Sequence, residues 1–175
     1  MHCNSLAAPS SELREADHQC LYGCLTLREP LNRSKNMFLR THFDLCTGCS
    51  LCQLACSQRI TGGFNPRRSV LRIEQARENL VHFPVVCTQC QNPMCATACP
   101  VQAITRDVSG RSWVVDPETC TGCGLCADYC PLGVIHLDQD TGKAVKCDLC
   151  GGDPECVKAC PTGALELISL GGDHD

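Results

Sequence analysis

The sequence predicts an α+β fold that is rich in loops, with short hairpins and short helices, and that depends on cysteines more than on an apolar core. The chain has 175 residues, of which 19 are cysteine, but only one Trp, two Tyr and four Phe. Large side chains normally dominate core burial, so a chain poor in them needs another source of compactness. The odd cysteine count argues against a disulfide framework and favours bound metal.

Charge and chain ends exclude several classes of protein. The net charge is -4, and the basic residues are spread along the chain apart from Arg67, Arg68 and Arg72, so no nucleic-acid partner is expected. The first residues, MHCNSLAAPSSELREADHQC, contain neither a basic stretch before an apolar run nor a twin arginine, which predicts a cytoplasmic protein. Apolar stretches such as FPVV are too short for a membrane anchor. A reducing cytoplasm also argues against disulfides.

Four cysteine quartets organise the chain from residue 46 onward. They are Cys46, Cys49, Cys52, Cys56; Cys87, Cys90, Cys95, Cys99; Cys120, Cys123, Cys126, Cys130; and Cys147, Cys150, Cys156, Cys160. The first and third quartets share the spacing C-x2-C-x2-C-x3-C, whereas the second and fourth have a longer middle gap. This alternation indicates that a unit of two quartets was duplicated.

Short apolar segments connect the quartets. PVQAI, PLGVI and PTGAL follow the second, third and fourth quartets, and each opening proline should end the helix before it. Hairpins are predicted over 103–115 and 134–145, with Gly110 and Gly142 in their turns. Between the first two quartets, VLRI at 70–73 predicts a strand and residues 74–80 one or two helical turns.

The quartet spacing is typical of [4Fe-4S] clusters. C-x2-C-x2-C supplies three thiolates to one cube through a tight loop and a short helical turn, and in two-cluster ferredoxins the cysteine before proline ligates the other cluster. The quartets are therefore expected to work in pairs. Gly48, Gly122 and Gly124 lie inside the ligand loops, where small residues let backbone amides approach the cluster sulfides.

The alternatives are weaker. Structural zinc sites use two separated CxxC pairs, whereas here a third thiol follows at short range and a fourth precedes proline in three quartets. His42, His82 and His136 are interpreted as surface or structural residues because the thiolate set is already complete. The remaining cysteines, Cys3, Cys20 and Cys24, have no cluster spacing, and the sequence gives them no role.

Four quartets in this order, with Cys-Pro closing the last three, resemble the iron–sulfur subunits of molybdenum and tungsten oxidoreductases, the dimethylsulfoxide reductase beta-subunit family. The resemblance covers residues 43–168. The segment GGFNPRRSVLRI at 62–73 is similar to the branch that serves tungsten aldehyde oxidoreductases and class II benzoyl-CoA reductase. Ser57 stands where the pattern has proline, a departure that removes no ligand.

The resemblance implies two fused bacterial ferredoxin-like domains with two [4Fe-4S] clusters each, pairing the first quartet with the fourth and the second with the third. The implied ligands are Cys46, Cys49, Cys52 and Cys160 for cluster 1; Cys87, Cys90, Cys95 and Cys130 for cluster 2; Cys120, Cys123, Cys126 and Cys99 for cluster 3; and Cys147, Cys150, Cys156 and Cys56 for cluster 4. Residues 41–86 with 141–175 form the first half and 87–140 the second, after an N-terminal extension of unknown role at 1–40.

The function implied is that of a non-catalytic electron-transfer subunit. It would pass single electrons through four [4Fe-4S] clusters between a large catalytic subunit containing tungsto- or molybdopterin and a further electron carrier. Two alternatives remain open: a freestanding polyferredoxin, or the ferredoxin-like subunit of a carbon monoxide dehydrogenase or hydrogenase system. A third, a zinc-stapled interaction scaffold, would contain zinc and no acid-labile sulfide.

Overall fold

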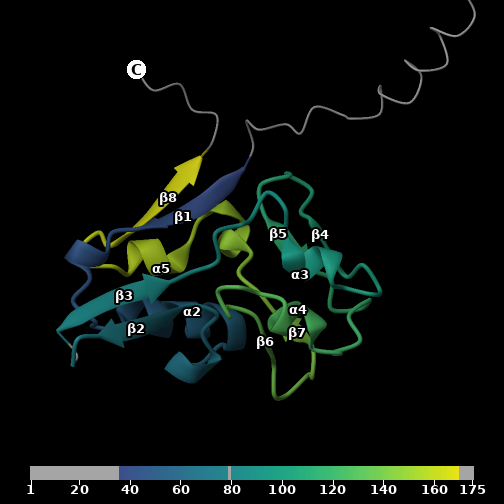
Figure 1. Ribbon diagram of the computed structural model, residues 1–175, viewed down its shortest axis with the longest axis horizontal. Coiled ribbons are helices and arrows are strands. Elements are labelled where there is room, and N and C mark those ends of the chain that lie inside the picture. The colour runs from purple at the N-terminus through teal and green to yellow at the C-terminus, as the bar shows by residue number, and fades with distance from the viewer. Residues whose placement is uncertain (1–35, 79, 170–175) are drawn as a thin grey trace, which may run out of the picture. The chain divides into compact units, whose positions relative to one another are not determined.

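The computed structural model describes residues 36–78 and 80–169, which form short helices and two-stranded sheets (Figure 1). The elements in chain order are β1 (Met37–Thr41), η2 (Phe43–Leu45), α2 (Leu51–Thr61), η3 (Pro66–Arg68), β2 (Arg72–Ala76), β3 (Val81–Val85), α3 (Met94–Thr97), β4 (Ile104–Arg106), β5 (Trp113–Val115), α4 (Leu125–Asp128), β6 (His136–Leu137), β7 (Ala144–Val145), η4 (Leu149–Gly152), α5 (Glu155–Lys158) and β8 (Leu165–Ser169). The short helices and strands agree with the predicted fold class. Cys3, Cys20 and Cys24, with most of the predicted N-terminal extension, lie outside the described residues.

One sheet joins segments that are far apart in sequence. β1 pairs antiparallel with β8, in a register that runs from Met37 opposite Ser169 to Thr41 opposite Leu165 (Figure 1). The end of the predicted extension therefore takes part in the fold through β1. Leu39 and Leu165, on these two strands, are both buried, so the pairing also closes part of the core.

The two predicted hairpins are confirmed. β4 pairs with β5, and β6 pairs with β7, each in antiparallel register. Gly110 and Gly142 lie in the connecting turns with φ of 70° and 68°, the left-handed region that glycine adopts without steric cost. These turns return the chain to the third and fourth quartets.

The prediction for residues 70–80 is wrong in its details. Val70 and Leu71 are consecutive buried residues that precede β2, and residues 74–76, predicted as helical, complete that strand. β2 pairs with β3 in a hairpin whose turn contains Arg77 and Glu78 at φ near 50°. Cross-strand pairing with Val81–Val85 outweighs the weak helical preference of so short a segment.

The described residues contain two clusters of buried apolar side chains. One combines third and fourth cysteines of the first quartet with Cys156 of the fourth, around Leu39, Val70, Leu71, Val86, Leu149 and Leu165. The other combines cysteines of the second and third quartets with Ala103, Ile104, Ile135 and Ala144. In keeping with this division, α2 contacts α5 and α3 contacts α4.

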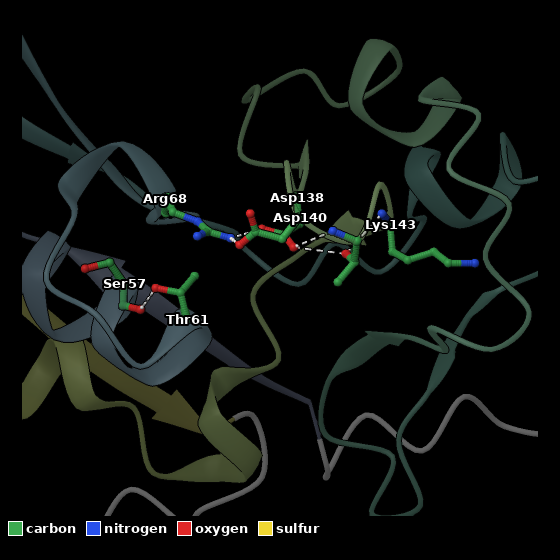
Figure 2. A network of polar contacts seen from close by, with 7 residues as sticks. Ser57, Thr61, Arg68, Asp138, Asp140 and Lys143 are labelled. Atoms are coloured by element: carbon green, nitrogen blue, oxygen red, sulfur yellow. Dashed lines mark hydrogen bonds and ion pairs between the residues drawn. The ribbon is translucent and has the colours of Figure 1, made fainter.

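Arginines tie the segment after the first quartet to the β6–β7 hairpin and to the turn that precedes it. Arg68, at the end of η3, forms ion pairs with Asp138 and Asp140 in that hairpin (Figure 2). Arg72 donates to the carbonyl oxygen of Leu132 at 2.8 Å and also to that of Gly133. The Arg68 guanidinium holds the pKa of Asp138 below its usual value, so this carboxylate stays charged at neutral pH.

Candidate metal centre

All four quartets have the same local geometry. In each, the first two cysteines precede a helix, in a loop or, for Cys150, in η4, and the third is the second residue of that helix, α2, α3, α4 or α5. These four helical cysteines, Cys52, Cys95, Cys126 and Cys156, are all buried. The tight loop followed by a helical turn is the arrangement expected from the spacing.

The loops share a left-handed residue at the same position. The residue before the second cysteine has positive φ in every quartet: 72° at Gly48, 50° at Gln89, 72° at Gly122 and 56° at Leu149. Glycine adopts this conformation freely, whereas other residues are strained in it. Gln89 and Leu149 are nevertheless nearly inaccessible, with 4% and 0% of their surface exposed, so in two loops a buried side chain replaces glycine.

The cysteines of the four quartets surround four cavities, each lined by thiols from more than one quartet. Cavity 1 is lined by Cys46, Cys49, Cys52 and Cys160; cavity 2 by Cys87, Cys90, Cys95 and Cys130; cavity 3 by Cys99, Cys120, Cys123 and Cys126; and cavity 4 by Cys56, Cys147, Cys150 and Cys156, with Cys87 also in its wall. Cavities 1, 2 and 3 are small, about 10, 30 and 10 Å³, and cavity 4 is larger, about 260 Å³.

The thiols in these sets influence one another electrostatically. Burial raises the pKa of Cys52 to about 11, and the nearby Cys160, Cys49 and Cys46 add to the rise. Burial likewise raises the pKa of Cys156 to about 12, with contributions from Cys56, Cys150 and Cys52. A metal must displace these protons to bind, because the thiolate is the ligand.

Cys126 and Cys95 follow the same rule in cavities 3 and 2. Burial is the main cause that raises the pKa of Cys126, and Cys120, Cys123 and Cys99 contribute. The pKa of Cys95 is raised by burial, an effect that the Lys146 ammonium opposes. The thiol neighbours therefore belong to the same sets that line the cavities, apart from Cys52 of cavity 1, which also affects Cys156 of cavity 4.

Backbone amides donate to three of these sulfur atoms. The amides of Ala103 and Ala164 lie 3.3 and 3.2 Å from the Sγ atoms of Cys99 and Cys160, four residues earlier in each case. The amide of Ala144 lies 3.5 Å from Cys120 Sγ. Hydrogen bonds to ligand sulfurs stabilise added negative charge, which is what a redox cluster needs on reduction.

Replacing Gly122 with alanine is expected to destabilise the third quartet's loop. A Cβ atom there would lie 2.2 Å from the carbonyl oxygen of Gly142, at a backbone φ of 72°. We expect a cost of about 1–2 kcal/mol for the left-handed backbone and a further 1–3 kcal/mol or so for overpacking. The measurement is visible cluster absorption during heating, which the Gly122→Ala variant should lose faster than the unmodified protein.

Gly142→Ala is the matched control for this variant. Its φ is 68°, but nothing lies within 4 Å of the added Cβ, so it carries the backbone cost alone. Equal heat sensitivity of the two variants would contradict the predicted clash.

The three histidines interpreted as surface or structural residues, His42, His82 and His136, do not line the thiol cavities. His42 Nε2 is 3.1 Å from the carboxylate of Glu166, and the His82 ring packs against Gly48 in the first ligand loop. No three His, Cys, Asp or Glu side chains between residues 36 and 169, residue 79 excepted, converge on a point that would suit a single ion. In a cubane cluster, by contrast, the four thiolates bind four different irons and therefore surround a volume and do not meet at one point.

Sequence analysis missed two residues at these cavities. Lys146 lines both cavity 2 and cavity 4, and Gln89 hydrogen bonds to the carbonyl oxygen of Cys147 at 2.8 Å. A signal for Gln89 was present, because it occupies the position where the first and third quartets have glycine. The sequence offers no comparable signal for Lys146, which can be placed only by the fold.

Comparison with protein families finds two iron–sulfur matches. The model described as "4Fe-4S dicluster domain" matches residues 78–170, and the one described as "4Fe-4S binding domain" matches residues 43–59. Together they span all four quartets. In the part of the chain that the structure describes, no helix combines the length and apolar character needed to cross a membrane.

Several curated proteins are similar over most of this chain. The polyferredoxin-like subunit of an aliphatic sulfonate oxidoreductase from Pyrococcus furiosus is 38% identical over 73% of each chain, and the thiosulfate reductase electron transfer subunit PhsB from Salmonella typhi is 36% identical over 80% of each. The NADH-dependent phenylglyoxylate dehydrogenase subunit beta from Aromatoleum evansii is 41% identical over 71% of this chain. This chain spans only 28% of that last relative's length.

A solved structure of the active site complex BamBC of benzoyl coenzyme A reductase covers 79% of this chain and 82% of its own, with 24% identity and a TM-score of 0.46.

Proposed function

This chain belongs to the 4Fe-4S dicluster family of ferredoxin-type iron–sulfur proteins, and we propose that it is an electron-transfer subunit with no substrate chemistry of its own. It passes single electrons through four [4Fe-4S] clusters between a catalytic subunit and another redox carrier. The observation that carries the proposal is that four cavities each bring together three cysteines of one quartet and the last cysteine of another, with Cys87 as a fifth cysteine in the wall of cavity 4.

We propose the cluster ligands on the same basis. Each cavity would hold the cluster of the same number. Each quartet would then contribute its last thiolate to the cluster of the quartet with which it is paired. The pairing of the first quartet with the fourth, and of the second with the third, is supported by the two separate clusters of buried side chains. These two groups correspond to two ferredoxin-like halves. The cluster, when bound, supplies the one-electron chemistry, and the chain supplies thiolates and amide donors.

Neighbouring cavities support a continuous electron path. Cys52 of cavity 1 and Cys156 of cavity 4 pack in one cluster of buried side chains, and Cys95 of cavity 2 packs with Cys120 of cavity 3 in the other. Cavities 2 and 4 share Cys87 and Lys146 in their walls. An electron would therefore pass the clusters in the order 1, 4, 2, 3. Cavities 1, 2 and 3 each have one exposed cysteine, Cys49, Cys90 and Cys123, whereas cavity 4 has none, which suits an inner position for cluster 4.

The partner is proposed to be a large redox subunit that contains tungsto- or molybdopterin. Support comes from the resemblance of the quartet order and from relatives named as subunits of oxidoreductases. The sixteen cysteines of the quartets are all unpaired, which suits a reducing compartment such as the cytoplasm.

Anaerobic purification of the native protein tests the proposal. We expect about sixteen iron and about sixteen acid-labile sulfide atoms per chain, four of each per cube, and co-purification with a large subunit whose metal is tungsten or molybdenum. Zinc without sulfide would overturn the cluster proposal. Elution as a free chain that exchanges between partners would instead favour the freestanding polyferredoxin.

A further inference from the structure

A buried ammonium group lies between two of the thiol cavities. Lys146 follows β7 and directly precedes Cys147, and only 9% of its surface is exposed. Its Nζ donates to the carbonyl oxygens of Trp113 at 2.8 Å and Cys147 at 3.0 Å, and to Gln89 Oε1 at 3.2 Å. These three acceptors match the three N–H bonds of an ammonium group.

None of the three acceptors carries a negative charge. Among the side chains that the structure describes, no carboxylate forms an ion pair with Lys146. A buried cation without a counter-charge is costly, because the solvation it loses is only partly replaced by neutral oxygens. The chain therefore keeps a positive charge at this place without a negative side chain to balance it.

The positive charge of Lys146 lies beside two of the cavities that are proposed to hold clusters. Lys146 lines the wall of cavity 2 and also that of cavity 4, whereas the linings of cavities 1 and 3 do not include it. Gln89 fastens this wall: its amide donates to the Cys147 carbonyl at 2.8 Å, and its oxygen accepts from the Trp113 amide at 2.9 Å. Three segments of the chain, from the second quartet, β5 and the fourth quartet, thus converge on the ammonium group.

A four-iron cube with four thiolates is net negative in both oxidation states and gains one more negative charge on reduction. A nearby cation stabilises both states, but it stabilises the reduced state more. We propose, resting on the function proposed above, that Lys146 is a positioning residue whose charge raises the reduction potentials of clusters 2 and 4 and so favours electron passage between the two halves. Gln89 holds the ammonium group at the shared wall.

The experiment is a redox titration of the purified, cluster-loaded protein, in which electron paramagnetic resonance monitors the reduction of each cluster. Lys146→Met removes the charge and keeps an unbranched side chain that is one atom shorter. We expect two of the four clusters to become harder to reduce, with about a tenfold fall in their ratio of reduced to oxidised form at fixed ambient potential. For a one-electron couple this is about 59 mV. An effect of this order is expected from one buried unit charge at an effective protein dielectric constant of about 20.

Two variants separate charge from packing. Lys146→Arg keeps the charge and should keep both potentials near their original values. Lys158→Met is the matched control, because it removes the same charge close to the fourth quartet. Lys158 is half-exposed and paired with Asp153 and Glu155, so solvent and these carboxylates already screen it. We expect a much smaller shift from this variant.

The outcomes distinguish this inference from the proposed function. If the unmodified protein holds no clusters, the proposed function fails. If it holds four and Lys146→Met leaves all potentials unchanged, or shifts all four equally, only the role of Lys146 fails. Should Lys146→Met not retain its iron, Gln89→Glu takes its place, because it sets a carboxylate against the ammonium group and should lower the same two potentials. Loss of iron in both variants would show that the residues serve assembly alone, which overturns the proposal.

Discussion

Removal of iron is expected to unfold residues 36–169 as a unit. Seven of the nineteen buried apolar residues in the described part of the chain are cysteines, and α3, α4 and α5 have four residues each. Helices this short and isolated two-stranded sheets are not stable alone in water. Cluster binding therefore supplies much of the free energy of folding, as metal binding does in small metal-dependent domains.

The measurement is far-ultraviolet circular dichroism and amide hydrogen exchange during anaerobic chelation. We expect the β1–β8 amides to lose protection together with the cluster absorption, and addition of iron and sulfide to restore both. Neither β1 nor β8 contains a cysteine, so the loss of their protection would report cooperative unfolding. A compact iron-free chain with protected β1–β8 amides would contradict the prediction.

Cys160→Ala is expected to damage the cluster of the first quartet, more than a hundred residues earlier in the chain. Cys160 lines cavity 1 with Cys46, Cys49 and Cys52, although the other cysteines of its own quartet line cavity 4. We expect the variant to lose up to about a quarter of its iron, the share of one cluster in four. Its paramagnetic resonance spectrum should match that of Cys49→Ala.

The controls for Cys160→Ala follow from the same geometry. Cys56→Ala should show the reciprocal effect, because Cys56 lines cavity 4, and its spectrum should match that of Cys150→Ala. A Cys160→Ala spectrum that matches Cys150→Ala instead would refute the crossed pairing of the quartets.

Much of the local structure could be predicted from the sequence because it depends on neighbouring residues. The loop and helical turn of each quartet follow from cysteine spacing, and the β4–β5 and β6–β7 hairpins follow from short apolar runs around Gly110 and Gly142. The β2 strand was misplaced, because residues 74–76 have no strong local preference and their pairing with β3 decides their conformation.

Cysteine spacing alone predicts the chemistry of this chain, because it sets sixteen thiols in four quartets at the spacing of cubane ligands. This holds because ligand loops are local, and the distance between cysteines along the chain sets which thiolates can face one cube. Which quartets share a cavity, and where Lys146 lies, depend on long-range contacts in the folded chain. Three kinds of contact join residues that are far apart in sequence. They are the β1–β8 pairing, the hydrogen bonds and ion pairs of Arg68 and Arg72, and the convergence of Gln89 and Cys147 on the Lys146 ammonium group. No local sequence pattern encodes such contacts.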